Sequence, residues 1–216
     1  MYGATETAPL VTILPRLHRL LDGPQARSCG RPMVGVQARV VDPDARTPVA
    51  VGEVGEVAVR GPNVMAGYWE KPEQTAAVLV DGWYYTGDLG YLDDEGYLYL
   101  VDRAKDMIVT GGENVYSTEV EDVLYRHPAV LEAAVFGIPD ERWGEAVHAV
   151  VVPRGDAEVT EDELRAHCRA AIAAYKVPKR IELRGEPLPK SGAGKLLKRE
   201  LRAPYWRDRE SLVSGA

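Results

Sequence analysis

Short apolar runs alternate with turn signals from Gly30 to Leu100, and this alternation limits the fold more than any other feature of the sequence. The runs are Ala38–Val41, Glu56–Val59 and Tyr97–Val101, and prolines, glycines and acidic residues stand between them. Short apolar runs bounded by turn residues are typical of β-hairpins. The sequence therefore predicts a mostly β unit in this half of the chain. The preceding stretch, Ala8 to Leu21, is partly apolar and compatible with a helix.

The pattern changes beyond Arg103. Thr118 to Glu121 and Thr160 to Glu163 both have the spacing of a capping box, which predicts two helix starts. Three later apolar runs predict strands, and they are Val130–Phe136, Val147–Val152 and Val177–Leu183. We therefore expect an α+β fold in three parts: a β-rich unit over residues 1–101, a linker over 102–106 and a compact α+β domain over 107–216.

The composition limits the class of partner. The 216 residues are 45% hydrophobic, which is enough to bury a core without disulfides or metal. With 26 basic and 33 acidic residues the net charge is -7, so we expect neither nucleic acid nor an anionic membrane as a partner. No apolar run approaches the roughly 20 residues of a membrane helix, and no leader-like segment opens the chain. Cys29, Cys168 and the histidines have no metal-ligand spacing, so we expect reduced thiols, no zinc and a cytoplasmic location.

A glycine-rich loop, Pro189 to Lys195, carries a lysine on backbone that can move easily. It is not a Walker A loop, because Pro189 replaces the first glycine and Leu196 follows the lysine where Ser or Thr should bind magnesium. A solvated turn that ends in a surface lysine is the simpler interpretation of this loop by itself.

Four further motifs are each weak alone. Tyr85 to Asp88 ends in a carboxylate that could hold a ribose diol, although turn aspartates are common. Asp102 to Asp106 is a charged segment at the predicted boundary, where a solvated linker is also expected. Gly111 to Asn114 would let a ligand approach the backbone closely, or could be a plain loop. Tyr2 to Glu6 offers an aromatic ring, a hydroxyl and a carboxylate, but could be disordered.

The order and spacing of these five motifs are more specific than any one of them. Together they resemble the adenylate-forming superfamily of acyl-CoA synthetases, peptide-synthetase adenylation domains and luciferases, over essentially the whole chain. The resemblance implies a β-rich remnant of the large adenylation domain, a distorted β-barrel-like subdomain, followed by a small mobile α+β lid. It also implies ATP or AMP, Mg2+ and coenzyme A as ligands.

The resemblance also implies roles for individual residues in the first part. Tyr2 would lie against adenine, and Thr5 would contact phosphate. Glu6 would help to hold Mg2+, so Thr5 and Glu6 count with the catalytic groups. Asp88 and Arg103 would hold the ribose.

In the second part, Lys105 would be the hinge residue. Lys195 would match the lysine that bridges carboxylate and phosphate oxygens during adenylation. Gly111 and Gly112 would border the tunnel through which coenzyme A reaches the acyl group. One lid would therefore serve two half-reactions.

Two longer stretches narrow the type. Val109 to Tyr116 and Asp140 to Glu145 look like acyl-CoA synthetases rather than peptide-synthetase domains. A carboxylic acid, with a fatty acid as the first choice, and coenzyme A are then the implied substrates. Ser117 and Thr118 stand where many relatives have Pro-Ala, and we expect Thr118 still to cap its helix.

The family's phosphate loop and acyl pocket lie upstream of Tyr2 and have no counterpart in this sequence. We therefore expect a carboxyl-terminal portion that is inactive alone, with a missing amino-terminal domain as its partner. A module that binds nucleotide or coenzyme A without turnover is the first alternative. A vestigial interaction domain that associates with itself through uncovered apolar surface is the second.

Overall fold

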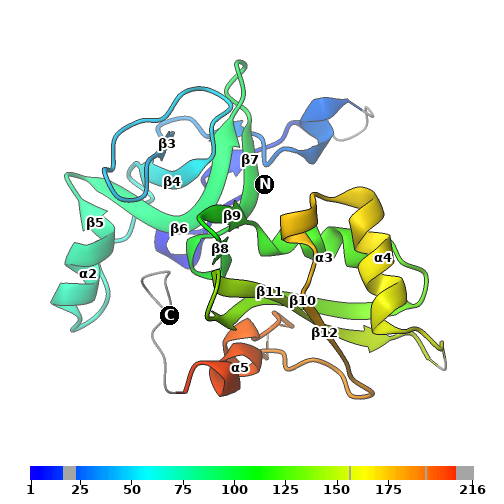
Figure 1. Ribbon diagram of the computed structural model, residues 1–216. Coiled ribbons are helices and arrows are strands. Elements are labelled where there is room, and N and C mark those ends of the chain that lie inside the picture. The colour runs from blue at the N-terminus through cyan, green and yellow to red at the C-terminus, as the bar shows by residue number, and fades with distance from the viewer. Residues whose placement is uncertain (17–22, 156, 193, 208–216) are drawn as a thin grey trace. The chain divides into compact units, whose positions relative to one another are not determined.

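The computed structural model describes residues 1–16, 23–155, 157–192 and 194–207 (Figure 1). It divides into two compact units, Met1–Ala104 and Lys105–Ala216. Each unit has its own sheet and its own buried core, so each is described by itself. The α+β fold class expected from the sequence is confirmed.

The first unit is built on an antiparallel five-stranded sheet in the order β3-β4-β6-β5, with β7 also paired to β6. Its elements are β3 (Gln37–Val41), β4 (Gly55–Arg60), α2 (Pro72–Val78), β5 (Leu79–Val80), β6 (Trp83–Leu92) and β7 (Leu98–Arg103). Before the sheet come η1 (Thr5–Thr7), β1 (Thr12–Ile13), η2 (Pro24–Arg27) and β2 (Arg31–Pro32). The sheet of these described strands is open and does not close into a barrel.

Alternation along the strands gives this sheet two apolar faces. Val57 and Val59 of β4 pack in one cluster, whereas Ala58 between them packs in another. The hairpin between β6 and β7 turns at Asp93, whose carboxylate accepts bonds from the backbone N–H groups of Glu95 (3.0 Å) and Tyr97 (2.8 Å). Side-chain capping of this kind fixes the turn, and so the register of the two strands.

The stretch Ala8 to Leu21, compatible with a helix by sequence, is not one continuous helix: residues 8–15 are not α-helical, and within the described part of this stretch helical backbone appears only at Arg16. Ala8 ends η1 in a left-handed conformation, with φ 46°, and Thr12–Ile13 forms β1. Residues 17–22 lie outside the described part of the chain. Tyr2 bonds across to Thr12, so backbone pairing decides this segment rather than its local helix propensity.

The second unit is a five-stranded sheet in the order β10-β11-β8-β9, with β12 parallel to β11. Its elements are η3 (Ala104–Asp106), β8 (Ile108–Thr110), β9 (Glu113–Val115), α3 (Ser117–Tyr125), β10 (Val130–Asp140), β11 (Gly144–Pro153), α4 (Glu161–Ala171), η4 (Ala174–Lys176), β12 (Arg180–Leu183), α5 (Lys198–Arg202) and η5 (Ala203–Tyr205). All three strands predicted in this half are present, with longer or shorter bounds.

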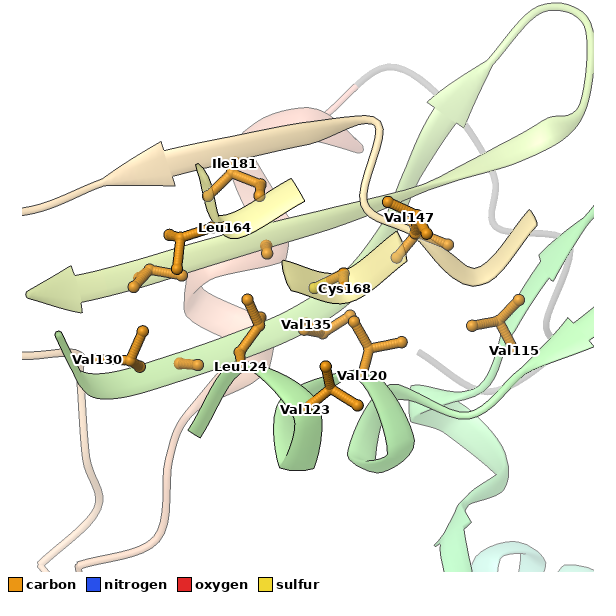
Figure 2. Packing of buried hydrophobic residues seen from close by; sticks show 14 of the residues in the cluster. Val115, Val120, Val123, Leu124, Val130, Val135, Val147, Leu164, Cys168 and Ile181 are labelled. Atoms are coloured by element: carbon orange, nitrogen blue, oxygen red, sulfur yellow. The ribbon is translucent and has the colours of Figure 1, made fainter. Parts of the chain in front are cut away.

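Both faces of this sheet are buried. Val135 and Val147 face a core that includes Leu124 of α3 and Leu164 of α4, as Figure 2 shows. Their strand neighbours point to the opposite face, where Leu201 of α5 packs. Burial of one such valine or leucine stabilises the fold by roughly 1.5–3 kcal/mol. This two-sided cover explains why β11 is apolar almost without alternation.

The two predicted helix caps have different outcomes. Thr160 caps α4, because its hydroxyl accepts a bond from the backbone N–H of Glu163 at 3.2 Å. The cap expected at Thr118 is wrong, since α3 starts at Ser117 with Tyr116 as its N-cap residue. The Glu121 carboxylate accepts the backbone N–H of Val135 at 2.7 Å. Within the described ranges, no helix combines the length and apolar character that a membrane span requires.

Candidate nucleotide and acyl-transfer site

Asp88 lies within strand β6, beside an irregularity in the register of β6 with β4. Gly87 has φ 72°, a left-handed conformation in which a side chain is strained, although no atom lies within 4 Å of where a Cβ would be. The N–H of Gly87 donates to Glu56 Oε1 at 2.8 Å, and the N–H of Asp88 donates to Thr86 Oγ1 at 3.1 Å. Side chains on both sides thus fix the backbone that carries the Asp88 carboxylate.

Three predicted nucleotide-binding residues meet at this carboxylate. The Tyr2 hydroxyl donates to Asp88 Oδ2 at 2.7 Å, and Arg103 Nε lies 3.4 Å from Asp88 Oδ1. Asp88 and Arg103 are direct partners in the register of β6 and β7. The pKa of Tyr2 is raised, first by burial and then by the negative charge of Asp88, so this phenol stays a neutral donor.

Tyr2 is 8% exposed and belongs to the core cluster with Val11 and Leu98. Its hydroxyl already bonds one oxygen of the carboxylate that was assigned to the ribose. Whether the ring also lies against adenine stays a prediction.

Thr5 and Glu6 lie in η1, next to a close backbone approach. A Cβ on Gly3 would stand 1.6 Å from the Pro9 carbonyl oxygen, so only glycine fits there. Thr5 is exposed, and Glu6 Oε1 accepts a bond from the Tyr68 hydroxyl at 3.1 Å. Tyr68 was not among the predicted residues, and the only signal for it was an aromatic pair in a glycine-containing loop.

The predicted magnesium position has one carboxylate. Over the described residues, no group of three or more His, Cys, Asp and Glu side chains could hold a metal. Mg2+ commonly takes one or two protein carboxylates and completes its shell with water and phosphate oxygens. Glu6 therefore fits as a single protein ligand to a nucleotide-bound ion, and not as part of a protein cage.

Lys105 lies in η3, at the start of the second unit. Its carbonyl oxygen accepts a bond from Arg202 Nη1 at 3.3 Å. Arg202 Nη2 lies 3.4 Å from Glu145 Oε1, and the fully buried Glu145 accepts the N–H of Val109 through its other oxygen at 3.1 Å. The predicted hinge and the strand that leads to the glycine pair thus share one buried charge network.

Gly111 and Gly112 form the tip of the β8–β9 hairpin, with φ 62° and 85°. Two left-handed residues are what a two-residue hairpin turn requires. The N–H of Gly111 donates to the Trp143 carbonyl at 2.9 Å, and a Cβ on Gly111 would be 2.7 Å from the Trp143 ring. Trp143 is 40% exposed. The sequence pointed to the motif Asp140 to Glu145 that contains it, but not to Trp143 itself.

Lys195 follows a tight turn in the last described loop. The N–H of Ser191 donates to the Lys195 carbonyl at 2.8 Å, and the N–H of Lys195 returns to Ser191 Oγ at 3.2 Å. The Lys195 side chain is exposed, and it forms no ion pair with any residue that the structure describes. Residue 193 lies outside the described part of this loop.

The structure therefore brings together Tyr2, Asp88 and Arg103, and it links Lys105 to the strand before Gly111. Thr5 and Glu6 lie on η1, and burial first, then the charges of Glu6 and Asp88, raise the pKa of Tyr84. The chemical role of each residue stays a prediction.

Comparison with known proteins finds two family models. Residues 1–69 match the AMP-binding enzyme family, and residues 119–195 match the AMP-binding enzyme C-terminal domain. A feruloyl-CoA synthase of Amycolatopsis sp. is 49% identical over 204 residues, which cover 94% of this chain and 40% of the relative. A long-chain-fatty-acid–CoA ligase of Salmonella typhimurium is 47% identical over 201 residues, which cover 93% of this chain and 35% of the relative.

Among solved structures, the ATP-bound MatB of Rhodopseudomonas palustris is similar with a TM-score of 0.85 and 38% identity. The match covers 94% of this chain and 40% of that one. The chain thus spans about 40% of the length of these relatives, which include CoA ligases. It belongs to the adenylate-forming, AMP-binding superfamily, and its relatives there include acyl-CoA synthetases.

Proposed function

We propose that a protein carrying this chain activates a carboxylic acid with ATP to an acyl-adenylate and transfers the acyl group to coenzyme A. The observation that carries the proposal is the Asp88 carboxylate, held on a left-handed turn opposite Arg103 in the strand register. Such a carboxylate can accept both hydroxyls of a ribose, and the Arg103 guanidinium beside it adds a charged hydrogen-bond donor. The similar solved structure of MatB contains bound ATP, which supports ATP as the nucleotide proposed here.

In adenylation, a carboxylate approaches the α-phosphate while negative charge builds on the phosphoryl oxygens. The exposed Lys195 ammonium, on a glycine-rich turn, can supply the opposite charge where it develops. Glu6 would hold Mg2+ beside the phosphates, where the ion neutralises charge. In the second half-reaction, the exposed backbone at Gly112 leaves room for the pantetheine arm, since a Cβ there would meet nothing within 4 Å.

The substrate acid is proposed only as a class. The two relatives named above act on acids of different kinds, an aromatic one and a long-chain one, according to their names. We take a fatty acid as the first substrate to test and ferulic acid as the second. We expect the chain alone to bind AMP without ligating, because about 60% of the relatives' length has no counterpart here.

Calorimetric titration of the chain with AMP, ATP and coenzyme A tests the nucleotide half-site. We expect AMP to bind, and Asp88→Ala to weaken it at least about tenfold, because charge-assisted hydrogen bonds to the ribose are lost. Asp94→Ala is the matched control, since Asp94 is exposed in the same hairpin and should leave AMP affinity unchanged.

Equal AMP affinity in the Asp88→Ala variant would contradict the nucleotide site. Nucleotide binding without ligation, even after the chain is joined to the upstream part of a relative, would favour a non-catalytic module. Oligomers that form with concentration and ignore all three ligands would favour a vestigial interaction domain.

A further inference from the structure

The segment before the lysine loop is tied to strand β10. Glu132 Oε2 accepts the backbone N–H of Leu188 at 2.8 Å, and Glu132 Oε1 forms an ion pair with Lys190. The Lys190 hydrogen bond and the Leu188 N–H together hold the pKa of Glu132 below its ordinary value. Glu132 alternates along β10 with Ala134 and Phe136, so its side chain lies on the face of the sheet where Leu188 packs.

The segment after the lysine loop is tied to helix α3. Lys198 Nζ donates to Ser117 Oγ at 2.7 Å and lies 2.7 Å from Glu121 Oε1. Ser117 is fully buried, and the side chains of Lys198 and Glu121 are 15% and 14% exposed. Ion pairs at this depth with good geometry are more specific than surface pairs.

Apolar packing fixes the same two segments. Leu188 and Leu201 are buried at 3% and 5% exposure in the cluster that contains Phe136, and Leu196 packs against it. Backbone bonds close the loop between them, since the N–H of Leu197 donates to the Pro189 carbonyl at 2.8 Å. The base of the loop is thus docked on the sheet at both ends, while Lys195 projects from it exposed.

We propose that Glu132 and Ser117 are positioning residues for Lys195: Glu132 fixes the segment before the loop, and Ser117, through Lys198, fixes the segment after it. The inference rests on the function proposed above. A turn rich in glycine can place a charge well only if its ends are fixed, because misplacement by about 1 Å can cost on the order of a hundredfold in rate. Ser117 matters in particular, because a proline at this position would offer no hydroxyl to Lys198.

The test uses this chain joined to the upstream part of an acyl-CoA synthetase that resembles it. Adenylation is followed by ATP–pyrophosphate exchange, and thioester formation is followed from preformed acyl-adenylate. Lys195→Ala is measured first and should slow adenylation by about a hundred- to a thousandfold. Glu132→Gln and Ser117→Ala should each slow it by roughly tenfold, and the double variant by more.

Thioester formation should change by less than about twofold in Glu132→Gln, because the bonds of Glu132 go to Leu188 and Lys190 beside the lysine loop. Slower adenylation with unchanged thioester formation would indicate that Glu132 positions the lysine loop. A folding defect in the whole unit would slow both half-reactions. Glu161→Gln is the matched control: it makes the same chemical change on α4, where Arg165 retains Asp162 as a partner at 2.6 Å.

Two results would overturn the inference while the proposed function stands: equal slowing of both half-reactions, or normal adenylation in the double variant when Lys195→Ala is slow. Normal adenylation in Lys195→Ala would remove the proposed role of Lys195, and the inference with it.

Discussion

At the residue scale, His148 is the most perturbed base in the described structure. It lies on β11, 3% exposed, with its ring 5.2 Å from the Phe136 ring. The Tyr205 hydroxyl donates to Glu182 at 3.0 Å and lies 3.2 Å from His148 Nε2. With the tyrosine proton used on the carboxylate, the tyrosine oxygen can accept a bond from His148 in the tautomer that carries its proton on Nε2.

Burial lowers the pKa of His148 from 6.5 to about 4, with Arg180 and Arg184 acting in the same direction and Glu182 opposing them. Because the pKa in the folded state is depressed, the stabilisation is fully present above pH 6.5 and is lost as pH falls towards 4. From pH 7 to pH 4.5 the free energy of unfolding of this unit should fall by about 2 kcal/mol through His148 alone.

This fall in the free energy of unfolding is measured by urea unfolding of the wild type and of His148→Gln, with hydrogen exchange of the β11 amides as the probe. The loss on acidification should be smaller in the variant by about that amount. Comparing the two proteins removes the shared contribution of Glu132, whose lowered pKa also weakens the fold in acid, whereas Glu182 is coupled to His148 and its contribution belongs to the difference. An identical loss in both proteins would show that His148 is not the group that titrates.

At the element scale, the start of helix α4 can be predicted from its local sequence. Thr160 caps it, three acidic residues occupy its first turn, and Arg165 pairs with Asp162 one turn on. Each of these features favours the amino-terminal end of a helix. Helix α3 has no such side-chain cap, and its start is determined by tertiary contacts of Ser117 and Glu121.

Thr160→Ala should therefore lower the free energy of unfolding of the second unit by about 1 kcal/mol, because the N–H of Glu163 loses its acceptor. Denaturant unfolding with amide exchange on α4 as the probe measures this loss. Thr160→Ser keeps the hydroxyl and should recover most of it. If serine and alanine were equally destabilising, the lost methyl group, and not the cap, would explain the effect.

At the scale of the whole molecule, the two units are joined at Ala104 and Lys105. On one side Arg103 is held by pairing with Asp88, and on the other the Lys105 carbonyl is held by Arg202. Between these two contacts lie the backbone dihedrals of Ala104 and Lys105, and the hinge at Lys105 stays a prediction.

Lys105→Pro tests the hinge. Proline fits the φ of a 3₁₀ turn, so the protein should fold, but its ring prevents that dihedral from changing. In the joined protein described above, we expect thioester formation to slow by at least about tenfold while adenylation is retained, because only the second step needs the lid to move. Lys105→Ala should retain both steps. An equal loss of both half-reactions in the proline variant would contradict the hinge.

Much of the fold followed from local patterns. Strands with apolar runs and the capped helix α4 were predictable, because their signals lie within a few residues of sequence. The start of α3, the strand β1 and the side chains of Tyr68 and Trp143 were not, because partners distant in sequence decide them. For the site, the motifs named candidate residues whose roles stay predictions, and they did not show that Tyr2 would already bond the Asp88 carboxylate.

The loop from Tyr2 to Thr12 is closed on itself. Tyr2 and Thr12 bond each other's backbone at 3.2 and 3.1 Å, and the Asn63 amide bridges the carbonyls of Thr7 and Leu10 from outside. An inserted residue would therefore break several bonds at once, whereas the turn near Gly52 is open around the position of an added Cβ. Evolutionary change in chain length should consequently be rare in the first segment and frequent in the second.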